Sequence, residues 1–140
     1  MASSFQPASA QSLELRAAAR DASARAYVPY SDFRVGAALQ FQDGSIVTGC
    51  NVENASFGLT ICGERTALVR AVAEGRDPGT IERIAVHVDG SDGQPCGMCR
   101  QFIAELAPNA IVAFMSAGEY VEGRVPALLP AAFVADALEA

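Results

Sequence analysis

The chain has 140 residues, 51% of them hydrophobic, and its 16 acidic and 10 basic residues give a net charge of −6. This acidic balance argues against nucleic acid as a partner, because such binding depends on Lys and Arg that neutralise phosphates. The same acidic charge favours a small neutral substrate. Short apolar runs and the lack of a secretory signal predict a cytoplasmic protein with no membrane partner. We expect one domain over residues 1–140, with residues 1–11 as a flexible tail.

Residue types that are absent or rare exclude further classes. All ten basic residues are Arg, so the chain has no Lys for a Schiff base or a phosphate-binding loop. The single histidine, His87, lies in an alternating apolar run and is expected to pack within a strand. Four cysteines in a cytoplasmic chain are reduced thiols or metal ligands, so any metal site must be built mainly from sulfur.

The first third of the chain predicts a helix followed by a hairpin. Ser12–Tyr27 carries apolar residues at helical spacing, and Pro29 is expected to end that helix. Val35–Phe41 and Ser45–Cys50 flank an Asp43-Gly44 pair, which is typical of a turn between two antiparallel strands.

The rest of the chain alternates helices and strands, which predicts a three-layer α/β/α sandwich around a mixed five-stranded sheet. The expected elements are a functional loop at Asn51–Thr60, a helix at Cys62–Glu74, a strand at Ile81–Val88, a short helix after Cys96 that ends before Pro108, a strand at Ala110–Met115, a weak strand at Val121–Val125 and a helical tail at Leu128–Leu138.

Two cysteine motifs, Cys62-Gly63-Glu64 and Pro95-Cys96-Gly97-Met98-Cys99, stand at predicted helix starts. There the helix dipole favours the thiolate form of cysteine. Three cysteine ligands leave one position of a tetrahedral zinc ion open for water, which is typical of a catalytic site. The motifs therefore predict a catalytic zinc ion held by Cys62, Cys96 and Cys99. A structural site completed by Cys50, or a redox pair at Cys96 and Cys99, is the alternative.

Glu64 stands two residues after the first predicted ligand, where a carboxylate can lie beside the metal without binding it. Hydrolytic removal of an amine needs a group that takes a proton from the attacking water and delivers it to the ring and the leaving nitrogen. We predict that Glu64 is this proton carrier. A solvated glutamate that complements the helix dipole is the alternative.

Together the two motifs match the pattern of zinc nucleobase deaminases, and the chain from about Tyr27 to Phe133 resembles the small homotetrameric cytidine deaminases. The resemblance implies a cytidine deaminase-like fold, one Zn²⁺ per subunit, and active sites shared between subunits. It also implies the conversion of cytidine and deoxycytidine to uridine and deoxyuridine in pyrimidine salvage, by attack of a zinc-bound hydroxide on the C4 carbon of the pyrimidine. The matching blocks are Tyr27-Val-Pro-Tyr-Ser-Asp-Phe33, Gly49-Cys-Asn-Val-Glu-Asn54, Cys62-Gly-Glu-Arg-Thr-Ala67, Pro95-Cys-Gly-Met-Cys-Arg-Gln101 and Leu129-Pro-Ala-Ala-Phe133.

The resemblance also assigns substrate contacts. Asn51 and Glu53 would bind the ribose 3′-hydroxyl, since an amide and a carboxylate can together donate and accept hydrogen bonds. Phe33 would pack on the pyrimidine, and Phe133 would reach the site of a neighbouring subunit. Gly63, where the family usually has alanine, would use its carbonyl to contact the amino group. Taken alone, the Asn51–Glu53 stretch is also typical of a turn, and Phe33 of a core residue.

Arg65 matches the arginine that accompanies all-cysteine sites in this family. Three thiolates and Zn²⁺ sum to a charge of −1, so a neighbouring cation would keep the metal an effective Lewis acid. We favour Arg65 over Arg100, for which a surface salt bridge is the alternative. Phe57 departs from the family pattern by replacing a frequent tyrosine, so a hydroxyl group at the pocket edge would be missing.

Two other functions compete with this one. A related deaminase of another base, such as a blasticidin or guanine deaminase, would share the zinc motifs, although Asn51 and Glu53 favour a ribose-bearing substrate. A zinc-stabilised interaction module would have an inert Glu64.

Overall fold

The computed structural model describes residues 4–138. Six strands form one sheet in the order β1-β6-β5-β4-β2-β3, in which β4 and β5 are parallel and all other neighbours are antiparallel. The strands are β1 (Gln6–Pro7), β2 (Val35–Phe41), β3 (Ile46–Cys50), β4 (Ile81–Val88), β5 (Ile111–Ser116) and β6 (Glu119–Arg124). The helices are α1 (Ala10–Ser23), α2 (Gly63–Ala73), α3 (Gly97–Leu106) and α4 (Val125–Leu128), with 3-10 turns at Phe57–Leu59, Pro78–Thr80 and Ala135–Leu138.

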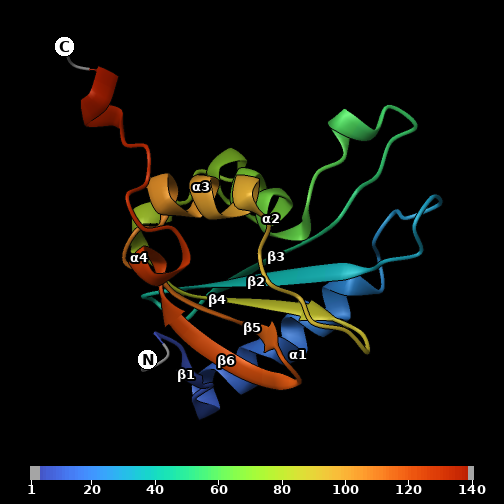
Figure 1. Cartoon of the computed structure of the whole chain (residues 1–140), viewed down its shortest axis with the longest axis horizontal. Coiled ribbons are helices and arrows are strands. Elements are labelled where there is room, and N and C mark those ends of the chain that lie inside the picture. Colours follow the sequence, from blue (N-terminus) through green and yellow to red (C-terminus); the bar gives the residue numbers. More distant parts are fainter. Residues whose placement is uncertain (1–3, 139–140) are drawn as a thin grey trace.

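Helices cover both faces of this sheet (Figure 1). Helix α1 packs on one face through a small cluster that includes Leu15, Ala19 and Ala85. The other face carries α2, α3 and α4 over a larger core of apolar side chains from β2, β4 and β5. The predicted three-layer α/β/α architecture is confirmed, and no helix among residues 4–138 is long and apolar enough to cross a membrane.

Two glycines bring the helices close to the β2–β3 hairpin at one edge of the sheet. A Cβ atom on Gly36 would lie 1.8 Å from the carbonyl oxygen of Ala19 in α1. On the opposite face, a Cβ atom on Gly49 would lie 2.4 Å from the backbone nitrogen of Ala67 in α2. Only a residue without a side chain permits these approaches, so α2 starts directly above the ends of β2 and β3.

Three predictions about the elements need correction. Helix α1 ends at Ser23 and not near Pro29, because Tyr27 leaves the helical path to exchange backbone hydrogen bonds with Asn51 and Glu53. A sixth strand, Gln6–Pro7, pairs with β6 within the segment expected to be a flexible tail; residues 1–3 of that segment lie outside the described residues. The expected helical tail at Leu128–Leu138 begins at the last residue of α4 and is otherwise helical only in the 3-10 turn at Ala135–Leu138.

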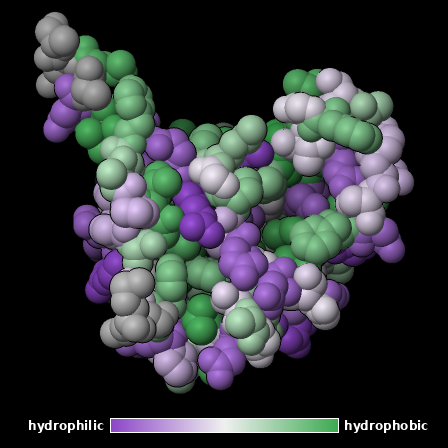
Figure 2. Space-filling view, in the orientation of Figure 1, coloured by the Kyte–Doolittle hydropathy of each residue, from purple (hydrophilic) through white to green (hydrophobic). Residues whose placement is uncertain are grey.

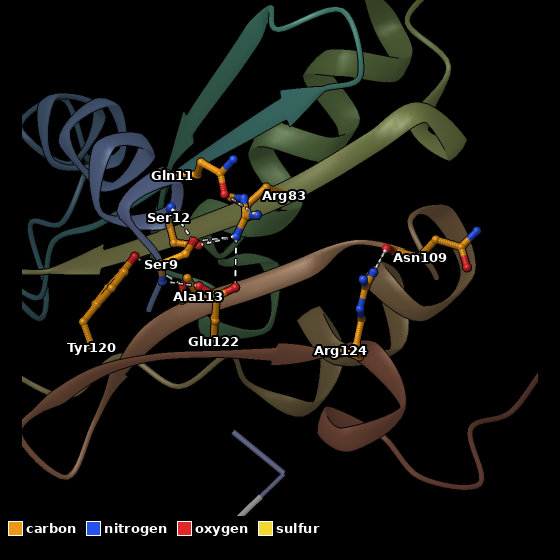
Figure 3. Close-up of polar contacts among 9 residues, drawn as sticks. All are labelled: Ser9, Gln11, Ser12, Arg83, Asn109, Ala113, Tyr120, Glu122 and Arg124. Atoms are coloured by element: carbon orange, nitrogen blue, oxygen red, sulfur yellow. Dashed lines mark hydrogen bonds and ion pairs between the residues drawn. The ribbon is translucent and has the colours of Figure 1, made fainter. Parts of the chain in front are cut away.

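A buried polar network joins α1 to the sheet (Figure 3). Arg83 of β4 and Glu122 of β6 point toward each other across β5, with 3.0 Å between Nη1 and Oε2. The same Arg83 nitrogen donates to the hydroxyl groups of Ser12 (2.7 Å) and Ser9 (3.2 Å), and Ser9 is the N-cap of α1. Charge and hydrogen bonds therefore fix the start of α1 on the sheet.

His87 packs within β4 as predicted and is buried on the α1 side of the sheet. Its Nδ1 accepts a hydrogen bond from Arg16 Nε at 3.2 Å, and its Nε2 lies 2.5 Å from Asp89 Oδ1. Both ring nitrogens thus have protein partners.

Candidate metal centre and substrate cavity

Three cysteine side chains converge where α2 and α3 begin. Cys62 is the N-cap of α2 and Cys96 is the N-cap of α3, so both motifs stand at helix starts as predicted. Cys99 lies in the first turn of α3 and is fully buried. The Sγ atoms of all three lie within 4.8 Å of one another, and among residues 4–138 Cys50 and His87 do not join this group.

The spacing of these sulfur atoms fits a tetrahedral zinc ion. Zn–S bonds of about 2.3 Å at tetrahedral angles separate two sulfur ligands by about 3.8 Å. The Cys62 and Cys96 Sγ atoms are 3.6 Å apart. Two helix N-termini also point their positive ends at the cluster, which favours anionic sulfur. The donor set and its geometry therefore suit a metal centre.

The thiols differ in acidity. A hydrogen bond from Cys99, supported by Arg65, lowers the pKa of Cys62 from 9.0 to about 5. Cys99 keeps its proton in this arrangement, and its hydrogen bond to Cys62 together with burial raises the pKa of Cys99. One thiolate is thus present at neutral pH before any metal arrives, and a bound cation would remove the proton of the second thiol.

Glu64 occupies the first turn of α2 beside the sulfur cluster and is only 3% exposed. Burial, with the negative Cys62 nearby, raises the pKa of Glu64 from 4.5 to about 7. A carboxyl group that titrates near neutrality can both accept and donate a proton at physiological pH. Its position and its acidity therefore suit proton transfer.

Arg65, the residue after Glu64, lies in the first turn of α2 and contacts the sulfur cluster. Its Nη2 donates to the Cys62 Sγ at 3.7 Å and to the Thr60 carbonyl oxygen at 3.3 Å. Its Nε is buried and has no hydrogen-bond partner among residues 4–138. The guanidinium therefore stands where its charge offsets that of the thiolates.

A cavity of about 560 Å³ opens in front of the cysteines, and this volume is in the range of small-molecule sites. The lining includes six residues that the sequence singled out: Phe33, Asn51, Glu53, Cys62, Glu64 and Cys96. Cys96 and the apolar side chains of Val86 and Val88 complete the part of the wall nearest the sheet. A larger groove of about 620 Å³ follows the outer side of α3, where Met98 and Phe102 make it mostly apolar.

Asn51 and Glu53 also organise the cavity wall. The Asn51 amide donates to the Phe33 carbonyl oxygen (2.7 Å) and accepts from the Val35 nitrogen (2.9 Å). The Glu53 carboxylate accepts from the backbone nitrogens of Tyr30 (3.0 Å) and Ser31 (3.2 Å) and from the Ser31 hydroxyl. Chiefly because of the Ser31 hydroxyl, the pKa of Glu53 is lowered, so it stays ionised at neutral pH. Both side chains thus hold the segment that presents Phe33 to the cavity.

The other predicted site residues lie nearer the edges. Gly63 is buried, and a Cβ atom there would make a close contact of 3.2 Å with the Val35 carbonyl oxygen. Phe133 is 61% exposed on the C-terminal segment that projects from the body of the molecule, and it does not line the cavity. Phe57 is also exposed, and its ring packs edge-on against Tyr30 instead of lining the cavity.

Two features near the site were not predicted from the sequence: the backbone contacts of Arg100 and the place of residues 92–94 in the cavity wall. Arg100 does not form a surface salt bridge; its Nε donates to the Pro95 carbonyl oxygen (2.7 Å) and its Nη1 to the Leu128 carbonyl oxygen (2.9 Å). This contact anchors the segment just before Cys96. Residues 92–94 form part of the cavity wall and are tied to the turn between β5 and β6. Only the Gly-Ser-Asp-Gly composition of that connection hinted at a defined turn.

Known proteins share this fold and these motifs. The sequence model of the cytidine and deoxycytidylate deaminase zinc-binding region matches residues 9–115. A cytidine deaminase of Halalkalibacterium halodurans is 50% identical over 114 residues, which cover 79% of this chain and 85% of the relative. A blasticidin-S deaminase of Bacillus cereus is 33% identical over 105 residues, covering 69% of this chain and 74% of the relative.

The crystal structure of a cytidine deaminase from Burkholderia pseudomallei superposes with a TM-score of 0.81 at 46% identity, over 86% of this chain and 98% of that one. This agreement covers the sheet, the helices and most of the chain length. Since the family model also spans well over half of the sequence, the protein belongs to the cytidine and deoxycytidylate deaminase family of zinc-binding hydrolases.

Proposed function

We propose that the protein catalyses the hydrolytic deamination of cytidine and deoxycytidine to uridine and deoxyuridine, as a step of pyrimidine salvage in the cytoplasm. In this reaction water adds to the C4 carbon of the pyrimidine, the bond from that carbon to the exocyclic nitrogen breaks, and ammonia leaves. The observation that carries the proposal is the juxtaposition of three convergent thiols with the buried Glu64 at the end of a nucleoside-sized cavity.

Cys62, Cys96 and Cys99 would hold one zinc ion per chain. When bound, zinc acts as a Lewis acid that lowers the pKa of a coordinated water to about 7. Arg65 would offset the net charge of −1 that three thiolates and Zn²⁺ create, because its guanidinium already contacts Cys62. The spacing of 3.6 Å between two of the sulfur atoms supports this assignment.

Glu64 would carry the protons of the reaction. Its carboxylate accepts a proton from the attacking water, delivers one to the ring nitrogen, and supplies another to the departing amine. Burial beside Cys62 gives this carboxyl group a pKa of about 7, which suits both directions of transfer.

Asn51 and Glu53 would bind the ribose 3′-hydroxyl. The two hydrogen bonds that Asn51 makes leave one Nδ2 proton free, and Glu53 Oε2, which accepts from the Ser31 hydroxyl alone, keeps a lone pair. Phe33 would stack on the pyrimidine, and the Gly63 carbonyl group would accept a hydrogen bond from the exocyclic amine. A nucleoside between these groups would place its base toward the cysteines and its sugar toward the 51–53 loop.

We further propose a homotetramer in which Phe133 completes the active site of a neighbouring subunit. Large apolar side chains are exposed on the lobe of residues 27–33 and 51–61 and on the C-terminal segment, with a hollow between the two (Figure 2). Extended apolar surface of this kind is typical of protein interfaces. The apolar groove along α3 offers further surface for such contacts.

Replacing Glu64 by glutamine tests the proposed function, because the amide keeps the size of the side chain but cannot accept a proton. The activity of Glu64→Gln toward cytidine should fall by about 10²–10⁴-fold while zinc content is kept. Glu82→Gln, the same substitution at an exposed position of β4, should leave activity unchanged. Full activity in Glu64→Gln would contradict the proton-carrier role and favour another mechanism.

A further inference from the structure

The connection between β4 and α3 forms one wall of the cavity and leads directly into Cys96. Asp92, Gly93 and Gln94 all line the cavity, yet the motifs and the reaction assign none of them a role. Each of the three is bonded to the β5–β6 hairpin. The Gly93 nitrogen donates to the Met115 carbonyl oxygen (2.9 Å), and Gln94 Nε2 donates to the Ser116 hydroxyl (3.2 Å).

Asp92 makes the most specific of these contacts. Its Oδ2 accepts from the Ala117 nitrogen at 3.0 Å, and its Oδ1 accepts from the Gly118 nitrogen at 3.3 Å. Ala117 and Gly118 have φ angles of 51° and 81°, so both occupy the left-handed region that a two-residue hairpin turn needs. The amides at the centre of such a turn have no partner in the strand ladder, and one carboxylate binds both of them.

The depth of this wall is set by close packing. A Cβ atom on Gly93 would lie 2.9 Å from Val88 Cγ2, and the Val88 side chain also lines the cavity. Release of the Asp92 contact would therefore let the backbone of residues 92–94 move away from Val88 and widen the cavity on that side.

The metal ligands are anchored separately from this wall. Arg100 binds the Pro95 carbonyl oxygen and so holds the chain just before Cys96. Cys62 and Glu64 belong to α2, which packs on β2 and β3 and not on the β5–β6 hairpin. Loosening of residues 92–94 should therefore change the fit of the substrate without displacing the zinc ligands or the proton carrier.

We propose that Asp92 is a positioning residue for substrate binding, which locks the cavity wall at residues 92–94 to the β5–β6 turn. This inference rests on the proposed nucleoside substrate. It predicts that loss of the Asp92 carboxylate affects KM more than kcat. The reacting groups stay in place, while the cavity wall at residues 92–94 is no longer held against the substrate.

The test compares Asp92→Ala and Asp92→Asn with Glu119→Ala, which removes the same charge from the same hairpin, at an exposed side chain with no hydrogen bond or ion pair among the described residues. In Asp92→Ala, the KM for cytidine should rise about tenfold with kcat and zinc content nearly unchanged, the effect of losing hydrogen bonds to a charged acceptor. Asp92→Asn keeps one acceptor oxygen and should show a smaller rise. Glu119→Ala should match the parent protein.

Amide hydrogen exchange of residues 89–95 and 115–118 provides a readout that needs no substrate. Exchange should accelerate in Asp92→Ala within these two segments only. An unchanged exchange rate or an unchanged KM would overturn the inference, as would loss of zinc together with a fall in kcat, which would indicate general unfolding. If the parent protein fails to deaminate cytidine, the proposed function fails on that result alone, and the exchange rates still decide whether Asp92 locks the wall.

Discussion

The buried ion pair between Arg83 and Glu122 has a matched counterpart on the surface of the same chain. The two pairs have similar separations, 3.0 Å for Arg83–Glu122 and 2.9 Å for Arg70–Glu74. Their side-chain exposures differ sharply, at 10% and 3% for the buried pair against 54% and 45% for the surface pair. Any difference between them in stability therefore reports on burial and on the hydrogen bonds that the buried pair makes to Ser9 and Ser12, and not on distance.

Removal of one buried partner should be costly. Glu122→Ala leaves the Arg83 guanidinium in the interior without its counter-charge, which destabilises a protein by about 3–5 kcal/mol. Glu74→Ala at the surface should cost no more than about 1 kcal/mol. With about 2.1 cal/mol/K of unfolding entropy per residue, a chain of 140 residues loses about 3.4 °C in Tm per kcal/mol. We therefore expect Tm to fall by about 10–17 °C in Glu122→Ala and by less than about 4 °C in Glu74→Ala.

Thermal unfolding followed by circular dichroism, at one protein concentration, measures both changes. The double variant Arg83→Met with Glu122→Leu should regain most of the lost stability, because a well-packed apolar pair can replace a buried ion pair. Burial raises the pKa of Glu122, but hydrogen bonds from Ser9 and Arg83 outweigh it and leave this pKa below 4.5. The carboxylate thus stabilises the fold above about pH 4.5, and this contribution is lost as the pH falls further. Equal effects of Glu122→Ala and Glu74→Ala would refute the reasoning.

Two further predictions concern the packing and the metal centre. Gly36→Ala should lower the free energy of unfolding by about 1–3 kcal/mol or more, because its Cβ atom would overlap the backbone of α1. Gly58→Ala should be tolerated, because nothing lies within 4 Å of the added Cβ atom. Urea unfolding distinguishes the two variants, and equal midpoints would contradict the close approach of α1. Cys99→Ser should lose most of its bound zinc, whereas Cys50→Ser should keep it, because Cys50 lies outside the cysteine cluster. Metal analysis of the purified proteins measures both. Loss of zinc in Cys50→Ser would instead support a structural site with four cysteine ligands.

Local signals in the sequence predicted the elements nearest the site. The strand at Val35–Phe41, the strand at Ile81–Val88 and the helix starts at Cys62 and Cys96 lie where alternation, turn residues and cysteine spacing indicated. These features depend on residues close together in the chain, so a pattern over a short window contains the information.

The missed features depend on contacts between distant segments. Residues 24–27 have helical composition, but Tyr27 pairs with the backbone of Asn51 and Glu53, and that competition ends α1 early. The two-residue strand at Gln6–Pro7 is too short for any periodicity and exists only because β6 lies beside it. For the same reason the sequence did not predict that Asp92 binds the Ala117 nitrogen or that Arg100 binds the Leu128 carbonyl oxygen, since these partners are 25 and 28 positions away.

The most direct test of the central claim is the reaction of the purified, zinc-loaded protein with cytidine, with product and metal quantified in the same sample. We predict one mole of uridine and one of ammonia per mole of cytidine consumed, and one zinc ion per chain. Turnover should be lost when a chelator removes the metal and should return when zinc is restored. Absence of uridine from the zinc-loaded protein, or undiminished turnover after complete removal of zinc, would contradict the account.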